Sequence, residues 1–285
     1  MFTEVKDSDL LGEVVTWDMG SAEVTYFQVK QALINAGLDP EDAKDLRATT
    51  CFSRAIKELK KGRVIEKLER NGDVLTFQFS QKHLDEYSKV MEYPYEAKVT
   101  LDLASGSIDC PESREIEQHA RTMFAHAQGH RVTSDITRLV QNMFAKHADL
   151  YALNSKGCAY FTPAVHREFS AKVERFMDEL GGKLRRYPVP KGTPEGNRSV
   201  KEAIEVGLGE MLDELRLAVD AWETNTRNDT MLRAVDRWKQ ISHKVEAYGE
   251  YLEDRQSTLL GALQAAKAEM VAKTQQIENE KAKAA

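Results

Sequence analysis

A run of basic residues between positions 44 and 70 could bind phosphate groups. The segment contains nine lysines and arginines and four acids, so its net charge is +5 in a chain of net charge −6. Clustered basic side chains neutralise the phosphates of nucleic acids. We therefore expect nucleic-acid contact at Arg54, Lys57, Lys60, Lys61, Arg63, Lys67 and Arg70. The alternative is that these charges only coat a solvent-exposed face, as most charge runs do.

The segment "EIEQHARTMFAHAQGH" (115–130) offers a second kind of chemistry. His126 and His130 are four residues apart, a spacing at which two imidazoles on one helical face can share a metal ion. His119 lies near the same side of the expected helix. The segment lacks the glutamate that serves as base in the zinc-protease motif H-E-x-x-H. These three histidines are candidate metal ligands, or else ordinary residues beside a buried stripe.

A third cluster of bases lies within the sequence "KLRRYPVPK" (183–191). Lys183, Arg185, Arg186 and Lys191 stand next to a loop rich in proline and glycine, expected over 187–199. These four side chains are candidates for contact with an anion or a partner. The alternative is an ordinary solvated connection.

Other sequence features argue against an enzyme with a known motif. We find no phosphate-binding loop, dinucleotide fingerprint, nucleophile elbow or paired C-x-x-C. Cys51, Cys110 and Cys158 lack metal-ligand spacing, and their odd number argues against a disulfide framework. Acids occupy the N-terminus where a signal peptide is basic, and no apolar stretch approaches the ~20 residues that cross a bilayer. We expect a cytoplasmic, non-enzymatic protein with no cofactor and no membrane contact.

The first 112 residues mix strand and helix periodicities, which predicts a small α+β head domain with two β-hairpins. We expect a strand at 13–17 and helices at about 23–37, 40–47 and 49–61. Asn71-Gly72 predicts the first hairpin, because both turn positions need positive φ. A second hairpin follows, with strict alternation over 95–103 and a return strand at 108–110. Two adjacent hairpins with apolar faces predict one antiparallel sheet covered by the small helices.

The layout of residues 23–80, three helices followed by a hairpin, resembles a winged-helix module. The resemblance implies that the third helix enters a major groove and that the hairpin contacts the DNA backbone. It departs from the family in one respect: only "AGLD" (36–39) separates the first two helices, where the module places a short strand.

The rest of the chain is expected to be mainly helical. Residues 113–198 form a helical middle region with helices at about 114–128, 134–148 and 165–180. Residues 199–285 are expected to form a long helical hairpin, with one helix at 199–223 and a second from 229 to beyond 275. A coiled-coil seam steps by three and four residues through Trp238, Ile241, Val245, Tyr248 and Leu252. Because the apolar pattern decays after this seam, we expect the last helix to project or to find a partner.

Three short segments, "CFSRAIKEL", "GCAYFTP" and "YPVP", resemble uncharacterised proteins of bacteria and of their phages and plasmids. This resemblance implies a role on mobile elements or in host conflict. The function we expect is a binding protein that contacts a protein partner or nucleic acid and assembles through its C-terminal helices. Two alternatives stay open: a structural or inhibitory oligomer without nucleic-acid contact, and a metal-dependent enzyme.

Overall fold

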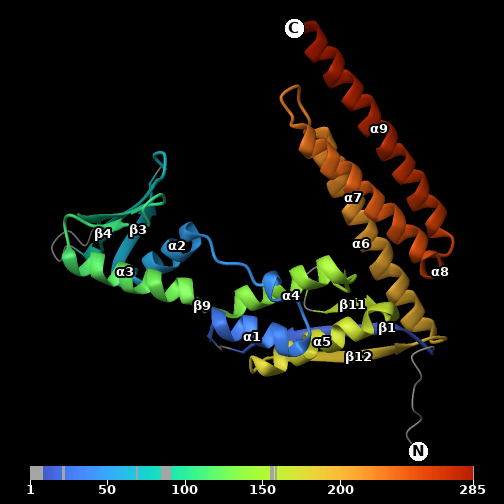
Figure 1. The fold of residues 1–285 in the computed structure, drawn as a ribbon, viewed down its shortest axis with the longest axis horizontal. Coiled ribbons are helices and arrows are strands. Elements are labelled where there is room, and N and C mark those ends of the chain that lie inside the picture. The colour runs from blue at the N-terminus through green and yellow to red at the C-terminus, as the bar shows by residue number, and fades with distance from the viewer. Residues whose placement is uncertain are drawn as a thin grey trace, which may run out of the picture. The chain divides into compact units, whose positions relative to one another are not determined.

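A computed structural model describes residues 9–20, 23–68, 70–84, 91–154, 157 and 159–284. It confirms the expected α+β class, with small antiparallel sheets and a C-terminal region of several long helices (Figure 1). The chain divides into two compact units, which we describe separately. Unit 1 comprises Met1–Trp17, Phe144–Ala171 and Leu184–Ala285, and unit 2 comprises Asp18–Met143 and Lys172–Lys183. Among the described residues, no helix combines the length and the apolar character that crossing a bilayer requires.

Unit 2 contains the two predicted hairpins, joined in one four-stranded antiparallel sheet of order β3-β4-β7-β8. Its strands are β3 (Arg63–Lys67), β4 (Val74–Gln81), β7 (Tyr95–Asp102) and β8 (Ile108–Asp109). One face packs on helices α2 (Ala48–Glu58) and α3 (Arg114–Gly129), where Phe52 meets Phe77 edge-on at 5.6 Å between ring centroids. The alternation of buried and partly exposed residues along β4 and β7 leaves the opposite face polar, as expected for a sheet covered on one side. Gly72 has φ of +57°, but Asn71 does not have the positive φ that the predicted Asn71-Gly72 turn requires. Asn71 and Val74 instead pair with each other, so the turn is shifted by one residue and Gly72 and Asp73 are its central residues.

The remaining elements of unit 2 are shorter. Helix α1 (Tyr26–Ala36) begins with a capping box between Thr25 and Gln28 and ends at Gly37 in the left-handed conformation. Strand β2 (Val24–Thr25) pairs with β9 (His130–Arg131), and β5 (His83–Leu84) pairs with β6 (Met91–Glu92). Helices α4 (Thr133–His147) and α5 (Arg167–Glu179) contribute residues to both units.

The winged-helix resemblance fails at its second helix. Instead of a helix over 40–47, a single 3-10 turn, η2 (Pro40–Asp42), is capped by Asp39. The next residues bury Ala43 and part of Leu46 without forming a helix. The Tyr26 hydroxyl donates a hydrogen bond to the Ala43 carbonyl, where the backbone is extended. Helix α2 packs against α3 and the sheet, so the three-helix core of a winged-helix module is not formed.

Unit 1 holds a second four-stranded sheet, of order β10-β11-β1-β12. Its strands are β1 (Leu10–Asp18), β10 (Tyr151–Ala152), β11 (Tyr160–Pro163) and β12 (Lys183–Pro190), and a 3-10 turn, η3 (Ala164–His166), follows β11. The loop expected over 187–199 is therefore corrected: β12 runs to Pro190, and helix α6 (Pro194–Asp220) begins four residues later. Both prolines fit these places, because an edge strand tolerates proline and the first helical position favours it.

The C-terminal region forms three packed long helices instead of two. The helix expected from 229 to beyond 275 is interrupted, giving α7 (Asn228–Ala247), a short α8 (Gly249–Leu252) and α9 (Arg255–Ala284). Helix α9 does not project as expected but lies along α6 and α7 (Figure 1), and it buries Leu263, Ala266, Met270 and Ile277. The apolar register decays after Leu252 because the chain turns there.

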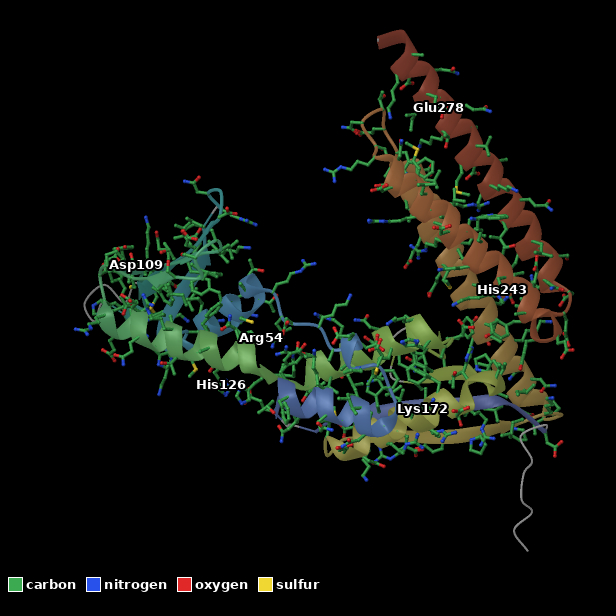
Figure 2. The ribbon with its side chains drawn as sticks, viewed as in Figure 1. Arg54, Asp109, His126, Lys172, His243 and Glu278 are labelled. Carbon is green, nitrogen blue, oxygen red and sulfur yellow. The ribbon has the colours of Figure 1, made fainter. Side chains whose placement is uncertain are left out.

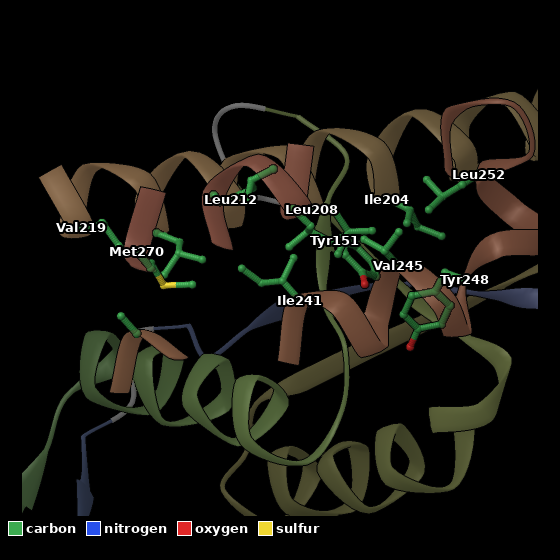
Figure 3. Packing of buried hydrophobic residues seen from close by; sticks show 14 of the residues in the cluster. Tyr151, Ile204, Leu208, Leu212, Val219, Ile241, Val245, Tyr248, Leu252 and Met270 are labelled. Carbon is green, nitrogen blue, oxygen red and sulfur yellow. The ribbon is translucent and has the colours of Figure 1, made fainter. Parts of the chain in front are cut away.

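Ion pairs show that α6 and α9 run parallel, since residue numbers rise together along both helices. Lys201 pairs with Asp254 at 2.7 Å, and Lys273 pairs with Asp220 at 3.7 Å. The five seam residues are covered by the same chain, and Figure 3 shows Ile241, Val245, Tyr248 and Leu252 packed among α6 side chains. The indole nitrogen of Trp238 donates a hydrogen bond to the Leu263 carbonyl at 2.9 Å. The predicted seam thus packs as a helix–helix interface within the chain.

The packing of α9 predicts that Leu263→Ala is destabilising. Leu263 is 1% exposed, so truncation leaves a cavity in the three-helix core and should lower the free energy of unfolding by about 2–5 kcal/mol. Leu232→Ala is the matched control, because Leu232 is 61% exposed on α7 and should change stability by less than about 0.5 kcal/mol. Urea unfolding of both variants measures the difference. Equal and small effects would show that α9 is not packed as described.

The turn into α9 predicts a stabilising substitution at Glu253. Its φ of +50° and ψ of −119° lie in a region that glycine adopts without strain. Glu253→Gly removes the exposed ion pair between Glu253 and Lys201, which contributes little to stability, while Lys201 keeps its ion pair with Asp254. We expect the relief of backbone strain to dominate and to raise the free energy of unfolding by about 1 kcal/mol. Asp254→Gly, at a neighbouring position without positive φ, should instead lower the melting temperature. A lower melting temperature for Glu253→Gly would contradict the strained turn.

Candidate functional site

Four exposed lysines at the end of α2 and on β3 form the first part of the candidate site. Helix α2 buries Phe52, Ala55 and Ile56 on one face. Lys57 on its other face, and Lys60 and Lys61 just after the helix, are exposed to solvent. Lys67 lies opposite Phe77 in register, which puts it on the sheet face that α2 covers. None of the four forms an ion pair with a residue that the structure describes. We call this group the lysine surface: Lys57, Lys60, Lys61 and Lys67.

The arginines of the same stretch have carboxylate partners within the chain. Arg54 makes two hydrogen bonds to Asp135, at 2.7 and 2.6 Å. Arg63 makes two to Glu96, at 2.7 and 2.8 Å. Arg70, which is exposed, reaches Asp73 at 3.2 Å. The seven bases expected to contact nucleic acid thus separate into three paired arginines and four lysines.

The pKa values of these groups follow from the pairing. Hydrogen bonding to Asp135 raises the pKa of Arg54 against the effect of burial. Burial acts to raise the pKa of Asp135, but the bonds from Arg54 and from the Val132 amide together lower it. The hydrogen bond from Arg63 lowers the pKa of Glu96. Both pairs therefore stay ionised and fix the positions of α2 and β3.

His126 in the last turn of α3 and His130, which follows the helix and begins β9, stack on each other beside α2. The rings of His126 and His130 are 4.0 Å apart and nearly parallel, and His126 Nδ1 lies 3.7 Å from a carboxylate oxygen of Glu23. Figure 2 shows Arg54 and His126 on the neighbouring helices α2 and α3. His119 is exposed further up α3. Within the described ranges, no three His, Cys, Asp or Glu side chains are grouped so as to hold a metal ion.

A cleft of about 400 Å³ joins the histidine pair to the lysine surface. Lys57 belongs to both, and Met123 gives the cleft part of its apolar wall. We call it the histidine cleft; its polar lining comes from Glu23, Arg54, Lys57, Glu58, His126 and His130. The sequence pointed to bases on α2 and histidines on α3 separately, and packing of α2 on α3 brings them together.

The bases near "KLRRYPVPK" do not gather into one loop. Arg186 pairs with the buried Glu13 at 2.9 Å, and Lys183 pairs with Asp178 at 3.4 Å. Arg185 and Lys191 are exposed. Since β12 holds most of these residues in an edge strand, they are spread along it.

A buried polar cluster in unit 1 was not expected from the sequence. Asp149 accepts hydrogen bonds from the Tyr248 hydroxyl and from Lys244, and His166 Nε2 lies 3.3 Å from the same carboxylate. Burial acts to raise the pKa of Asp149, but the bonds from His166, Lys244 and Tyr248 outweigh it and hold this pKa well below its usual range. The partners are separated by up to 99 residues, so no local pattern reveals them. Because its partners occupy the Asp149 carboxylate, the cluster ties α7 to the end of α4 and has a structural role.

The Asp149 cluster predicts a pH-dependent contribution to stability. The folded-state pKa is depressed, so the contribution is fully present above the unfolded pKa of about 3.9 and is lost as pH falls toward the folded value. Asp149→Asn should cost about 3–5 kcal/mol near pH 7, and the difference from wild type should shrink below about pH 4. Urea midpoints between pH 3 and 8 measure it. Asp236→Asn, in an exposed pair with Lys239, serves as control; a pH-independent Asp149→Asn effect would refute the assignment.

Comparisons with known proteins place the chain in a family. Neither the curated proteins nor the solved structures contain a match. A family model matches residues 10–283, which extends over nearly the whole chain and includes parts of both units. The chain therefore belongs to the family of unknown function DUF6744.

Proposed function

We propose that this protein is a non-enzymatic binding protein that contacts the phosphates of a nucleic acid through its lysine surface. The observation that carries the proposal is the contrast within residues 54–70. The arginines there have carboxylate partners, whereas Lys57, Lys60, Lys61 and Lys67 are exposed and pair with no described residue. In a chain of net charge −6, these lysines form a cluster of exposed positive charges, as binding of an anionic partner requires.

Because the exposed bases are lysines and not arginines, we expect them to bind the phosphate backbone of the nucleic acid and not to recognise its base sequence. A lysine ammonium is a strongly hydrated point charge, whereas the arginine fork reads planar acceptors such as guanine edges. Arg54 and Arg63 hold carboxylates with both arms of the fork. We therefore expect binding that depends on salt and varies little with base sequence.

The histidine cleft favours single strands over duplex. Unpaired bases stack on aromatic rings, histidine included, whereas a paired base cannot enter a cleft. His126 and His130 present a stacked pair next to Lys57. Helix α2, in contrast, packs against both α3 and the sheet, which argues against its use as a major-groove recognition helix.

The proposal includes two features that the sequence suggested. The resemblance of "CFSRAIKEL", "GCAYFTP" and "YPVP" to phage and plasmid proteins supports a role on a mobile element. The buried free thiols of Cys51 and Cys110 support a cytoplasmic location; Cys158 lies outside the described residues. Assembly through the seam residues is not included, because they are covered by the same chain.

Charge removal at the lysine surface tests the proposal. The variant carries Lys57→Gln, Lys60→Gln, Lys61→Gln and Lys67→Gln, and fluorescence anisotropy follows a labelled 20-nucleotide single strand and the matching duplex between 25 and 200 mM salt. We expect wild type to prefer the single strand. The variant should bind the single strand at least about tenfold more weakly. The slope of log affinity against log salt should become shallower by about 3, since each lysine–phosphate contact contributes about 0.7 on a single strand.

The matched control removes four exposed lysines elsewhere: Lys98, Lys239, Lys267 and Lys281. It changes the net charge equally and should leave affinity and salt slope nearly unchanged. An equal loss in both variants would mean that only total charge matters. Absence of binding by wild type at 25 mM salt would refute nucleic-acid contact.

A further inference from the structure

Unit 1 contains a groove with a cavity volume of about 810 Å³ that the proposed function does not use. One wall is the first half of α6, and the other consists of β10, β11 and the residues around them. Volumes of 300–1,000 Å³ are typical of sites that enclose a ligand or a short segment of chain.

The floor of the groove is apolar. Phe161, Val200 and Ala203 lie at its base and are buried, and Val206 on α6 is 50% exposed toward it. A side chain at Gly207 would meet the Tyr151 ring at 2.6 Å, so glycine is what allows α6 to approach the sheet at the floor. An exposed valine above a buried apolar floor favours a ligand that also carries apolar groups.

Three glutamates of α6 line this groove. Glu195, Glu202 and Glu210 are seven and eight residues apart, which puts them about 10 and 12 Å apart along the helix axis. None of them pairs with a residue in the described part of the chain. Among the described lining residues there is no lysine or arginine.

Other acids on the same helix do have partners. Glu205 pairs with Arg255 at 3.6 Å, Glu214 with Arg237, and Asp220 with Lys273. The three groove glutamates thus remain unneutralised although α6 elsewhere forms ion pairs. Bringing a cation to such a site relieves the repulsion between like charges.

We propose that this groove binds a cationic peptide segment of a partner protein, with apolar side chains between its basic residues. Carboxylates 10–12 Å apart match basic residues about three or four positions apart in an extended peptide, and the intervening apolar side chains would cover Val206 and the floor. The groove's negative charge disfavours nucleic acids, phosphates and anionic lipids. The site is independent of the lysine surface, which belongs to unit 2.

A displayed library of random 12-residue peptides tests this proposal. The library is selected on the full-length protein and counter-selected on Glu202→Lys/Glu210→Lys. We expect the enriched peptides to contain lysine or arginine every three or four residues with apolar residues between them. One enriched peptide, synthesised with a fluorophore, should bind the double variant at least about tenfold more weakly than wild type.

Two further variants separate groove binding from general charge attraction and from misfolding. Asp213→Lys/Glu278→Lys makes the same charge change at exposed acids outside the groove and should bind the peptide as wild type does. Val206→Asp keeps the glutamates but adds a charge to the apolar surface, and it should also weaken binding about tenfold. Circular dichroism confirms folding of each variant. Enriched peptides without excess basic residues, no enrichment at all, or equal losses in the two charge-reversal variants would each overturn the proposal.

Discussion

The ion pair between Arg54 and Asp135 determines how the candidate site of unit 2 is built. Both arms of the guanidinium reach the carboxylate, whose side chain is only 7% exposed, and the same carboxylate accepts the Val132 amide at the start of α4. Removing one partner of such a buried pair typically costs about 3–5 kcal/mol. The pair therefore ties α2 to the start of α4, at the histidine cleft that Arg54 and Val132 help to line, while the apolar core packs α2 on α3. It also neutralises Arg54. Because Arg63 and Arg70 are paired as well, lysines carry the remaining positive charge of residues 54–70.

Each unit has a charged surface, because some of its charged side chains form ion pairs within the chain and others do not. The two surfaces have opposite charge. In unit 2, carboxylates pair with the three arginines of residues 54–70 and leave the four lysines of the lysine surface without a described partner. In unit 1, bases take up several acids of α6 and leave the three groove glutamates. A formal net charge of −6 hides both surfaces. If both proposals hold, one chain can hold a nucleic acid and a basic partner protein at separate sites.

Local patterns predicted most elements of the fold. Alternation over 95–103 predicted β7, and the Asn71-Gly72 signal predicted the first hairpin with its turn one residue early. Periodicity predicted α3 within a residue of its observed bounds. Three predictions failed where local pattern was overridden. At 40–47 the chain is extended at Ala43, whose carbonyl accepts a hydrogen bond from Tyr26, so the predicted helix stops after one turn. The prolines of 187–199 were read as a loop, although an edge strand accepts them. The decay of the seam after Leu252 was read as a projecting end instead of a turn. For the candidate site, the sequence indicated which basic residues and histidines could bind a ligand, but not which of them are paired or lie close together. Asp135 is 81 residues from Arg54, so no spacing in the sequence distinguishes the paired arginines from the exposed lysines.

The central claim is that four particular lysines contact an anionic partner. Lysine acetylation by an activated ester, with mass spectrometry of each site, tests it in the unmodified full-length protein with and without a single-stranded oligonucleotide. We predict that the oligonucleotide slows acetylation severalfold at Lys57, Lys60, Lys61 and Lys67. The acetylation rates of Lys98 and Lys239 should stay unchanged. Unchanged reactivity at the four lysines, or equal protection of lysines throughout the chain, would contradict it.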